Sequence, residues 1–153
     1  DAITAMRADP EKYISVCYYN MTCSRIAKSV LAGGNKCALD VRLVNRRRCM
    51  PTMEGKPGSR SVLMVNYEYT VSEVQEKTVT LECVMTKNRF TVTKLHVNQH
   101  MHWAQTRTCH SLQGSSVDGS IVLWDLESRL ITPEFIYVAM TRARSLDEVY
   151  YVV

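Results

Sequence analysis

The 153-residue sequence has no run of apolar residues that approaches the roughly 18 residues a membrane-spanning helix needs, which excludes such a helix. Residues 1–12 (DAITAMRADPEK) lack the apolar segment of a signal peptide. Because residue 1 is Asp and not Met, we expect a fragment of a longer chain. Hydrophobic residues make up 46% and charged residues 22% of the sequence, which excludes a disordered chain and indicates one globular domain with at most a small insertion.

The six cysteines include no Cys-x-x-Cys pair. Three of them, Cys17, Cys83 and Cys109, lie in apolar runs, where a free cysteine behaves as a small buried hydrophobic residue. We therefore expect a reducing, intracellular compartment, without a choice between nucleus, cytoplasm and a viral replication site.

A phosphate-binding P-loop is also missing. The nearest segment, Gly55-Lys56, has Met50 where the first glycine of GxxxxGK[ST] belongs and Pro57 where a serine or threonine is required. Proline removes both a backbone N–H and the magnesium-binding hydroxyl. The chain by itself is therefore expected to hydrolyse no nucleoside triphosphate by this route.

Two further kinds of active site are not indicated. The four histidines, at positions 96, 100, 102 and 110, have no His-Glu-x-x-His spacing, so scattered histidines are expected and no metal site. Cys109 and His110 are adjacent and, in a strand, would point to opposite faces, so they cannot form a nucleophile–base pair.

The net charge of +4 permits an anionic partner without requiring one. Four arginines, Arg42, Arg46, Arg47 and Arg48, fall within seven residues. They form either a solvated basic loop or a surface that binds nucleic acid.

The hydrophobic pattern favours an α/β fold. Residues 13–19 and 120–125 are typical of buried strands, with a helix predicted over 21–32 behind Asn20 as its N-cap. A second helix is predicted from Thr132-Pro133-Glu134. Residues 35–60 are loop-like, 61–66 resume a strand, and 67–101 contain short β runs split by polar turns.

Two segments near the C-terminus carry the most specific signal: Thr108-Cys-His-Ser-Leu-Gln-Gly114 and Tyr137-Val-Ala-Met-Thr-Arg-Ala143. They resemble motifs V and VI of superfamily 1 helicases in the RecD-like and Pif-type branch, with an apolar strand between them as that family requires. Tyr18-Tyr19-Asn20 resembles motif IV less strongly. The resemblance implies the second RecA-like domain of such a helicase: a mainly parallel sheet flanked by helices over 1–66 and 102–153, with a small SH3-like antiparallel β insertion over 67–101.

The resemblance also implies a role in ATP hydrolysis. In this family an arginine of motif VI stabilises charge on the γ-phosphate, which makes Arg142 the expected arginine finger, with Arg144 as the second choice. Gln113 and Gly114 would lie beside the nucleotide. ATP and Mg²⁺ would be held mainly by the first RecA-like domain, which this chain does not contain.

The same resemblance implies contacts with single-stranded DNA through Thr108, His110, Ser116 and Asn20. A hydroxyl and an imidazole can donate to phosphate oxygens without reading the bases. If residues 108–110 form a strand, the side chains of Thr108 and His110 share one face. For Asn20, the N-cap role explains the residue equally well. Ser111 stands where relatives often have lysine, which removes one possible phosphate contact.

The expected function is therefore that of the C-terminal motor domain of an ATP-dependent DNA helicase. Its partners would be single-stranded DNA, the N-terminal RecA-like domain of the same polypeptide and other replication proteins, with no membrane. Two alternatives stay open: a non-catalytic nucleic-acid-binding module, and an interaction domain or scaffold within a replication complex.

Overall fold

The computed structural model describes residues 2–48, 63–112 and 117–152. The chain forms two compact units: Asp1–Gly34 together with Gln105–Val153, and Asn35–Ala104. The second unit therefore begins before residue 67 and ends after residue 101, the limits that the sequence suggests for the insertion. The division into domains stays a proposal. Each unit is described by itself.

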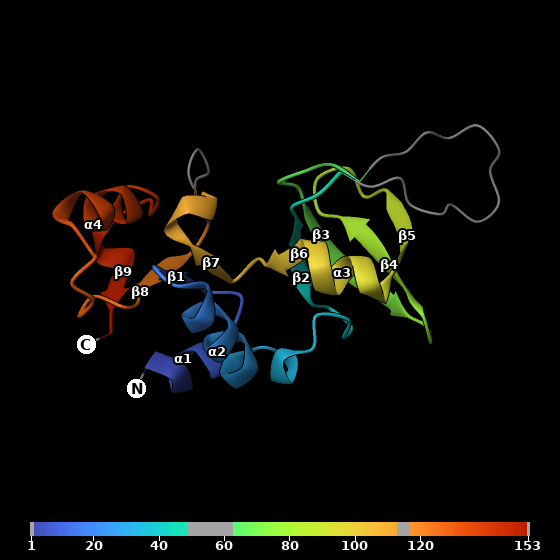
Figure 1. The fold of residues 1–153 in the computed structure, drawn as a ribbon, viewed down its shortest axis with the longest axis horizontal. Coiled ribbons are helices and arrows are strands. Elements are labelled where there is room, and N and C mark those ends of the chain that lie inside the picture. Colours follow the sequence, from blue (N-terminus) through green and yellow to red (C-terminus); the bar gives the residue numbers. More distant parts are fainter. Residues whose placement is uncertain (1, 49–62, 113–116, 153) are drawn as a thin grey trace. The chain divides into compact units, whose positions relative to one another are not determined.

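The first unit is built on a four-stranded sheet in which all neighbouring strands are parallel (Figure 1). Its strands, in spatial order, are β7 (Thr106–Thr108), β1 (Tyr13–Cys17), β8 (Ser120–Leu123) and β9 (Val149–Tyr151). Its helices are α1 (Ala2–Ala8), α2 (Asn20–Val30) and α4 (Pro133–Met140), with short 3₁₀ turns η1 (Ala32–Gly34), η2 (Cys109–Leu112) and η3 (Leu146–Glu148). This confirms the predicted mainly parallel α/β sheet.

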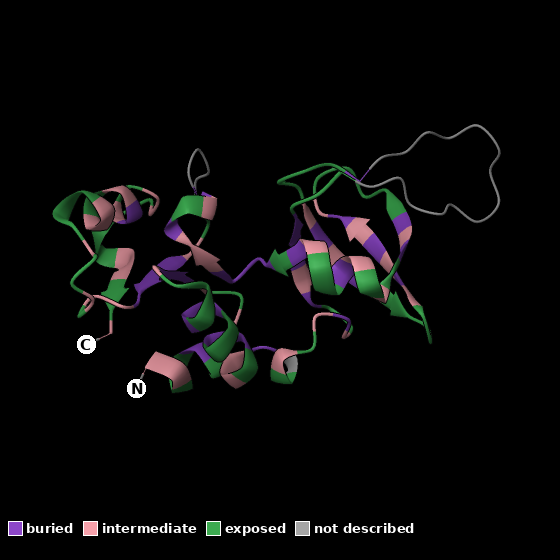
Figure 2. Ribbon diagram, in the orientation of Figure 1, coloured by how far each residue is buried: buried purple, intermediate pink, exposed green. Residues whose placement is uncertain are grey.

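Helices cover both faces of this sheet because its strands are apolar on both sides, as parallel strands usually are. On one face Val16, Ile121 and Leu123 pack against η2 and α4. On the other face Cys17 and Val122 pack against α1 and α2. Figure 2 shows the buried residues concentrated on the strands and on the inner sides of these helices.

The predicted helix at Thr132 is confirmed. The hydroxyl of Thr132 accepts a hydrogen bond from the backbone N–H of Phe135 at 3.3 Å, Pro133 occupies the first turn, and Glu134 complements the helix dipole. The N-cap predicted at Asn20 is wrong. Tyr19 is the N-cap residue of α2 and Asn20 its first helical residue, and the cap residue makes no side-chain hydrogen bond.

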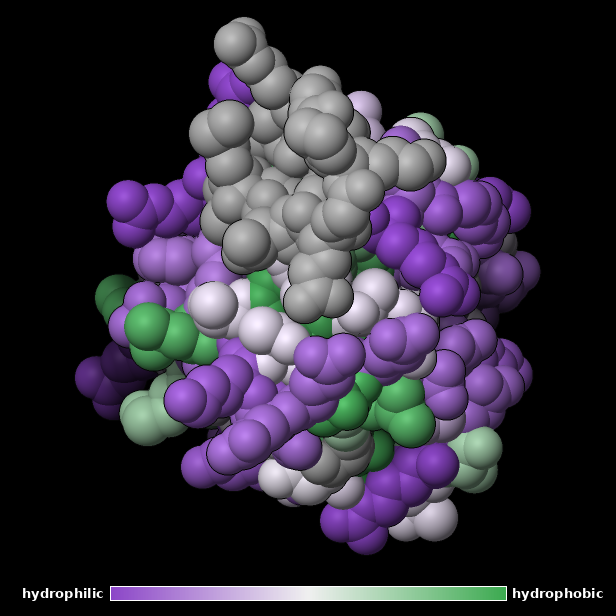
Figure 3. Space-filling model, turned by 90° about the vertical axis from the view of Figure 1, so that its right-hand side faces the viewer, coloured by the Kyte–Doolittle hydropathy of each residue, from purple (hydrophilic) through white to green (hydrophobic). Residues whose placement is uncertain are grey.

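The second unit is a five-stranded antiparallel sheet with one helix. Its elements are β2 (Arg42–Asn45), β3 (Glu68–Val74), β4 (Thr78–Cys83), β5 (Arg89–Thr93), α3 (Lys94–His100) and β6 (Met101–Trp103). Strand β4 alternates buried and half-buried residues along its whole length, so one face of the sheet holds the core. Figure 3 shows a largely hydrophilic described surface on this side of the molecule, with small hydrophobic groups between.

The structure corrects three details of the expected pattern. Residues 42–45, expected in a loop, form β2, which pairs with both β3 and β6. Residues 94–100 are helical, so His96 and His100 stack on one helix face with ring centroids 5.3 Å apart. The strand expected at residues 61–66 reduces, in its described part, to an isolated bridge at Leu63. The segment around Gly55 lies outside the described residues.

We predict that Gly119→Ala destabilises the first unit by about 2–4 kcal/mol. Gly119 has φ +122°, and an added Cβ would lie 2.6 Å from the carbonyl oxygen of Lys12, which itself accepts from the Ser120 N–H. The matched control is Gly33→Ala, where φ is +63° and the space is open, so only about 1 kcal/mol is expected. Urea unfolding followed by circular dichroism measures both, and equal losses would contradict the prediction.

Candidate functional site

The candidate site lies at the carboxyl edge of the parallel sheet. Strand β1 stands between β7 and β8, with Cys17 beside Thr108 and Val16 beside Leu123. The chain leaves β7 and returns as β8 on the other side of β1, so the strand order reverses at this point. In open parallel sheets, ligands bind outside the carboxyl ends of the strands at such a reversal. Both the motif V segment and the motif IV segment begin here.

Thr108 is the last residue of β7, and the chain then turns into η2. The Thr108 hydroxyl oxygen accepts from the Ser111 N–H at 3.4 Å, and the Thr108 carbonyl accepts from the Ser111 hydroxyl at 2.8 Å. Residues 108–110 are therefore not a continuous strand, which corrects the expectation that Thr108 and His110 share one strand face. His110 is exposed on η2. Thr108 keeps its hydroxyl hydrogen available for donation.

Asp125 is a site residue that sequence reasoning did not identify. Its Oδ2 accepts from the backbone N–H groups of Tyr18 and Tyr19 at 3.1 and 3.2 Å, and its Oδ1 accepts from the Thr22 hydroxyl at 2.7 Å. This carboxylate satisfies the backbone N–H of the N-cap residue Tyr19 and of Tyr18 before it, and so fixes the chain where it enters α2. The sequence feature that could have indicated Asp125 is its position just after the apolar run of β8, at the sheet edge where β1 also ends.

Asp125 also has φ +65°, a left-handed conformation that aspartate tolerates better than most residues. A non-glycine residue in this region persists where surrounding contacts hold it, often at functional sites. Here the three hydrogen bonds hold it, and they place Asn20 at the start of α2, exposed, three residues past the end of β1.

Arg142 follows Thr141, the C-cap of α4, so it lies just beyond the helix and not within it. Its carbonyl accepts from the Val117 N–H at 3.1 Å, which joins the end of motif VI to the chain after motif V. Burial raises the pKa of the Cys109 thiol, and the positive charge of Arg142 partly opposes this rise. The Arg142 guanidinium therefore acts electrostatically on η2. Arg144, in contrast, forms an exposed ion pair with Asp118.

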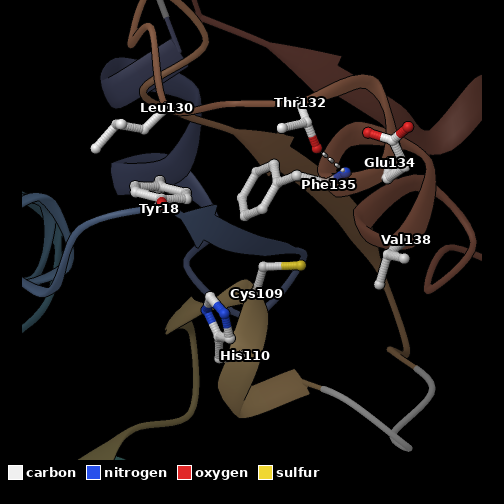
Figure 4. Close-up of a pocket in the computed structure, with 8 residues that line it drawn as sticks. All are labelled: Tyr18, Cys109, His110, Leu130, Thr132, Glu134, Phe135 and Val138. Atoms are coloured by element: carbon white, nitrogen blue, oxygen red, sulfur yellow. Dashed lines mark hydrogen bonds between the residues drawn. The ribbon is translucent and has the colours of Figure 1, made fainter.

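A pocket of about 300 Å³ opens at this edge of the sheet (Figure 4). Its apolar lining residues are Tyr18, Cys109, Leu130, Phe135 and Val138, and its polar ones are His110, Thr132 and Glu134. The rings of Tyr18 and Phe135 meet edge to face with centroids 5.3 Å apart. The pocket thus joins Tyr18 and His110, from the segments that resemble motifs IV and V, with the first turns of α4.

The second unit carries a separate group of cationic side chains around a buried amide. The Asn45 amide nitrogen donates to the carbonyls of Arg47, Leu63 and Met64 at 2.8, 3.3 and 3.2 Å. Its Oδ1 is therefore the acceptor, and the Nε2–H of His96 donates to it at 3.1 Å. Burial lowers the pKa of His96 first, and the charges of His100 and Arg47 lower it further.

The arginine run is thus not one solvated loop. Arg42 lies in β2 and pairs with Glu68 at 2.6 Å. Arg46 donates to the Asn66 amide oxygen at 3.0 Å and Arg47 to His100 Nε2 at 3.4 Å, and no carboxylate among the described residues forms an ion pair with either. Exposed arginines without a carboxylate partner suit a polyanion.

Three predicted site residues, Gln113, Gly114 and Ser116, lie outside the described residues. Within residues 2–48, 63–112 and 117–152, no group of three or more His, Cys, Asp or Glu side chains could hold a metal ion. In the same part of the chain, no helix has the length and hydropathy to cross a membrane.

The parallel sheet with helices on both faces, together with the antiparallel unit, defines a RecA-like α/β fold with a small β insertion. This fold is found in Pif1 helicase structures. One is a Pif1 helicase from Bacteroides in complex with ADP-AlF3 and single-stranded DNA, with a TM-score of 0.66 and 13% identity over 97% of this chain and 42% of that one. Bacteroides Pif1 bound to single-stranded DNA has a TM-score of 0.64 and 14% identity over 91% of this chain and 40% of that one.

A third structure, of DNA unwinding at forked duplex DNA by two coordinating Pif1 helicases, has a TM-score of 0.64 and 14% identity over 97% of this chain and 42% of that one. No protein-family model and no curated protein sequence matches the chain. At this identity the likeness shows the fold, and it confirms the predicted Pif-type RecA-like architecture. The chain spans about 40–42% of the length of these helicases.

We predict that Asp125→Ala destabilises the first unit by about 2–4 kcal/mol, because three hydrogen bonds to a charged acceptor are lost at the start of α2. The matched control is Asp118→Ala, which removes an exposed ion pair and should cost less than about 1 kcal/mol. The midpoints of urea unfolding give both values. A loss at Asp125 no larger than that at Asp118 would contradict its role.

Proposed function

We propose that the chain is the C-terminal motor domain of an ATP-dependent superfamily 1 DNA helicase, supplying an arginine finger and contacts to single-stranded DNA. One observation carries this proposal: the segments that resemble motifs IV, V and VI, far apart in sequence, meet at one edge of the parallel sheet in a Pif1-like fold. The division into a RecA-like domain and a small β insertion belongs to the same proposal.

Single-stranded DNA would meet this edge through its phosphates. The hydroxyl of Thr108 retains a donor, His110 and Asn20 are exposed, and Ser116 follows two residues after the segment that resembles motif V. Such contacts position a strand without reading its sequence. The exposed arginines Arg46 and Arg47 favour a polyanion as well, and two of the similar Pif1 structures contain single-stranded DNA.

ATP would bind against this domain and a first RecA-like domain that carries the P-loop. This chain would contribute the positive charge of Arg142. Arg142 is half-buried, and its Nε is shielded from solvent. Its charge partly opposes the rise that burial causes in the pKa of Cys109 in η2. An arginine suits the γ-phosphate because it is always charged and can donate two parallel hydrogen bonds. Gln113 and Gly114 would border the nucleotide. Mg²⁺ is assigned to the first domain, whose carboxylates would hold it. A similar Pif1 structure contains ADP-AlF3.

We predict weak binding of the chain to single-stranded DNA that falls steeply as salt rises, because counterions are released from neutralised phosphates. The double variant Thr108→Val, His110→Ala should weaken binding at low salt roughly threefold to tenfold, since two phosphate contacts are lost. Thr91→Val on β5 is the matched control and should bind as the unaltered chain. Fluorescence anisotropy of a labelled oligonucleotide measures all three, and salt-independent affinity would contradict the proposal.

We predict that Arg142→Ala lowers ATP turnover at least ~10³-fold in a polypeptide that joins this chain to a P-loop domain, with DNA affinity nearly unchanged. Arg144→Ala should have a small effect, because its guanidinium is held by Asp118. The exposed Arg129→Ala is the control for loss of charge. Phosphate release with and without single-stranded DNA measures turnover. Parallel loss of turnover and DNA affinity in Arg142→Ala would indicate a structural role and contradict the finger.

A further inference from the structure

The pocket at the sheet edge has the features of a site for a flat aromatic ring. At about 300 Å³ it lies at the lower end of the range for small-molecule sites, which suits one ring system. Tyr18 and Phe135 offer aromatic surface, and Leu130, Cys109 and Val138 supply the remaining apolar lining. Aromatic side chains bind unpaired bases by stacking, and each such stack strengthens binding appreciably.

Of the three polar residues that line this pocket, His110 and Glu134 can carry opposite charges. Figure 4 shows His110 below the Tyr18 and Phe135 rings and Glu134 beyond Phe135, beside Thr132. A carboxylate repels phosphate, whereas an imidazole can donate to it. A nucleotide would therefore place its phosphate toward His110 and the polar edge of its base toward Glu134.

We propose that this pocket binds one base of single-stranded DNA, and that Glu134 makes it prefer bases that carry an exocyclic amino group over thymine. This inference rests on the proposed function and deepens it, because phosphate contacts alone would leave the domain indifferent to sequence. Glu134 would be the residue that determines this specificity.

The preference follows from what an ionised carboxylate can accept. Hydrogen bonds from its own backbone N–H and from the Thr132 hydroxyl hold the pKa of Glu134 below its usual range, so it stays an acceptor only. Cytosine presents an amino group that a glutamate accepts well. Thymine has no amino group, and its ring N–H lies between two carbonyl oxygens. These oxygens repel a carboxylate, so thymine is expected to bind less well beside Glu134.

The test compares the chain's affinity for short oligo-dC, oligo-dT and an oligonucleotide with abasic sites, at one low salt concentration. We expect oligo-dC to bind roughly fivefold more tightly than oligo-dT, since one good amino–carboxylate pair discriminates on this scale. Glu134→Gln should remove the difference, because an amide both donates and accepts. Glu127→Gln, an exposed change of the same charge in the preceding loop, should keep it.

A second variant tests the stacking of the base on the aromatic lining of the pocket. Phe135→Leu retains an apolar side chain at the start of α4 and should bring the affinity for oligo-dC down to that for the abasic strand, a loss of about tenfold. Equal affinity of the unaltered chain for all three strands would overturn the pocket while leaving phosphate binding intact. A dC preference that persists in Glu134→Gln would overturn the role of Glu134. No binding to any strand would overturn both this inference and the proposed function.

Discussion

The carboxylate of Asp125 is the interaction on which the candidate site depends. Asp125 follows β8 with its backbone in a left-handed conformation. Its carboxylate accepts hydrogen bonds from the N–H groups of Tyr18 and Tyr19 and from the Thr22 hydroxyl. The end of one buried strand is thereby tied to the first turn of the helix that follows its neighbour. Without this tie, the N–H groups of Tyr18 and Tyr19 would lose their acceptor, and the chain that carries the Tyr18 ring and Asn20 would be held less firmly.

Local chemistry predicted those elements whose signals lie within a few residues. The strand at residues 120–125 and the helix behind Thr132 follow from an apolar run and from a Thr-Pro-Glu start, and both are present. The motif segments predicted a RecA-like sheet because strand, loop and helix recur there in a fixed order. Such signals need no knowledge of what packs against them.

The remaining features depend on partners distant in sequence. Asn20 is a suitable cap residue by type, yet the start of α2 is held through Tyr18, Tyr19 and Thr22 by a carboxylate about a hundred positions later, so no local pattern could reveal it. Residues 42–45 form a strand because β3 and β6 pair with them on both sides. The turn into η2 is instead a local feature, since the N–H and the hydroxyl of Ser111 donate back to Thr108 three residues earlier.

The short turn η2 lies between the proposed DNA contact at His110 and the proposed arginine finger at Arg142. The exposed His110 of η2 borders the pocket, while the buried Cys109 lines that pocket and experiences the charge of Arg142. The carbonyl of Arg142 also accepts from the N–H of Val117, so the chain just after residues 113–116 is hydrogen-bonded to the end of the segment that resembles motif VI. The proposed DNA contact at His110 and the proposed finger at Arg142 are thus neighbours in the same unit, and such proximity is what a coupling between the two proposed roles would require.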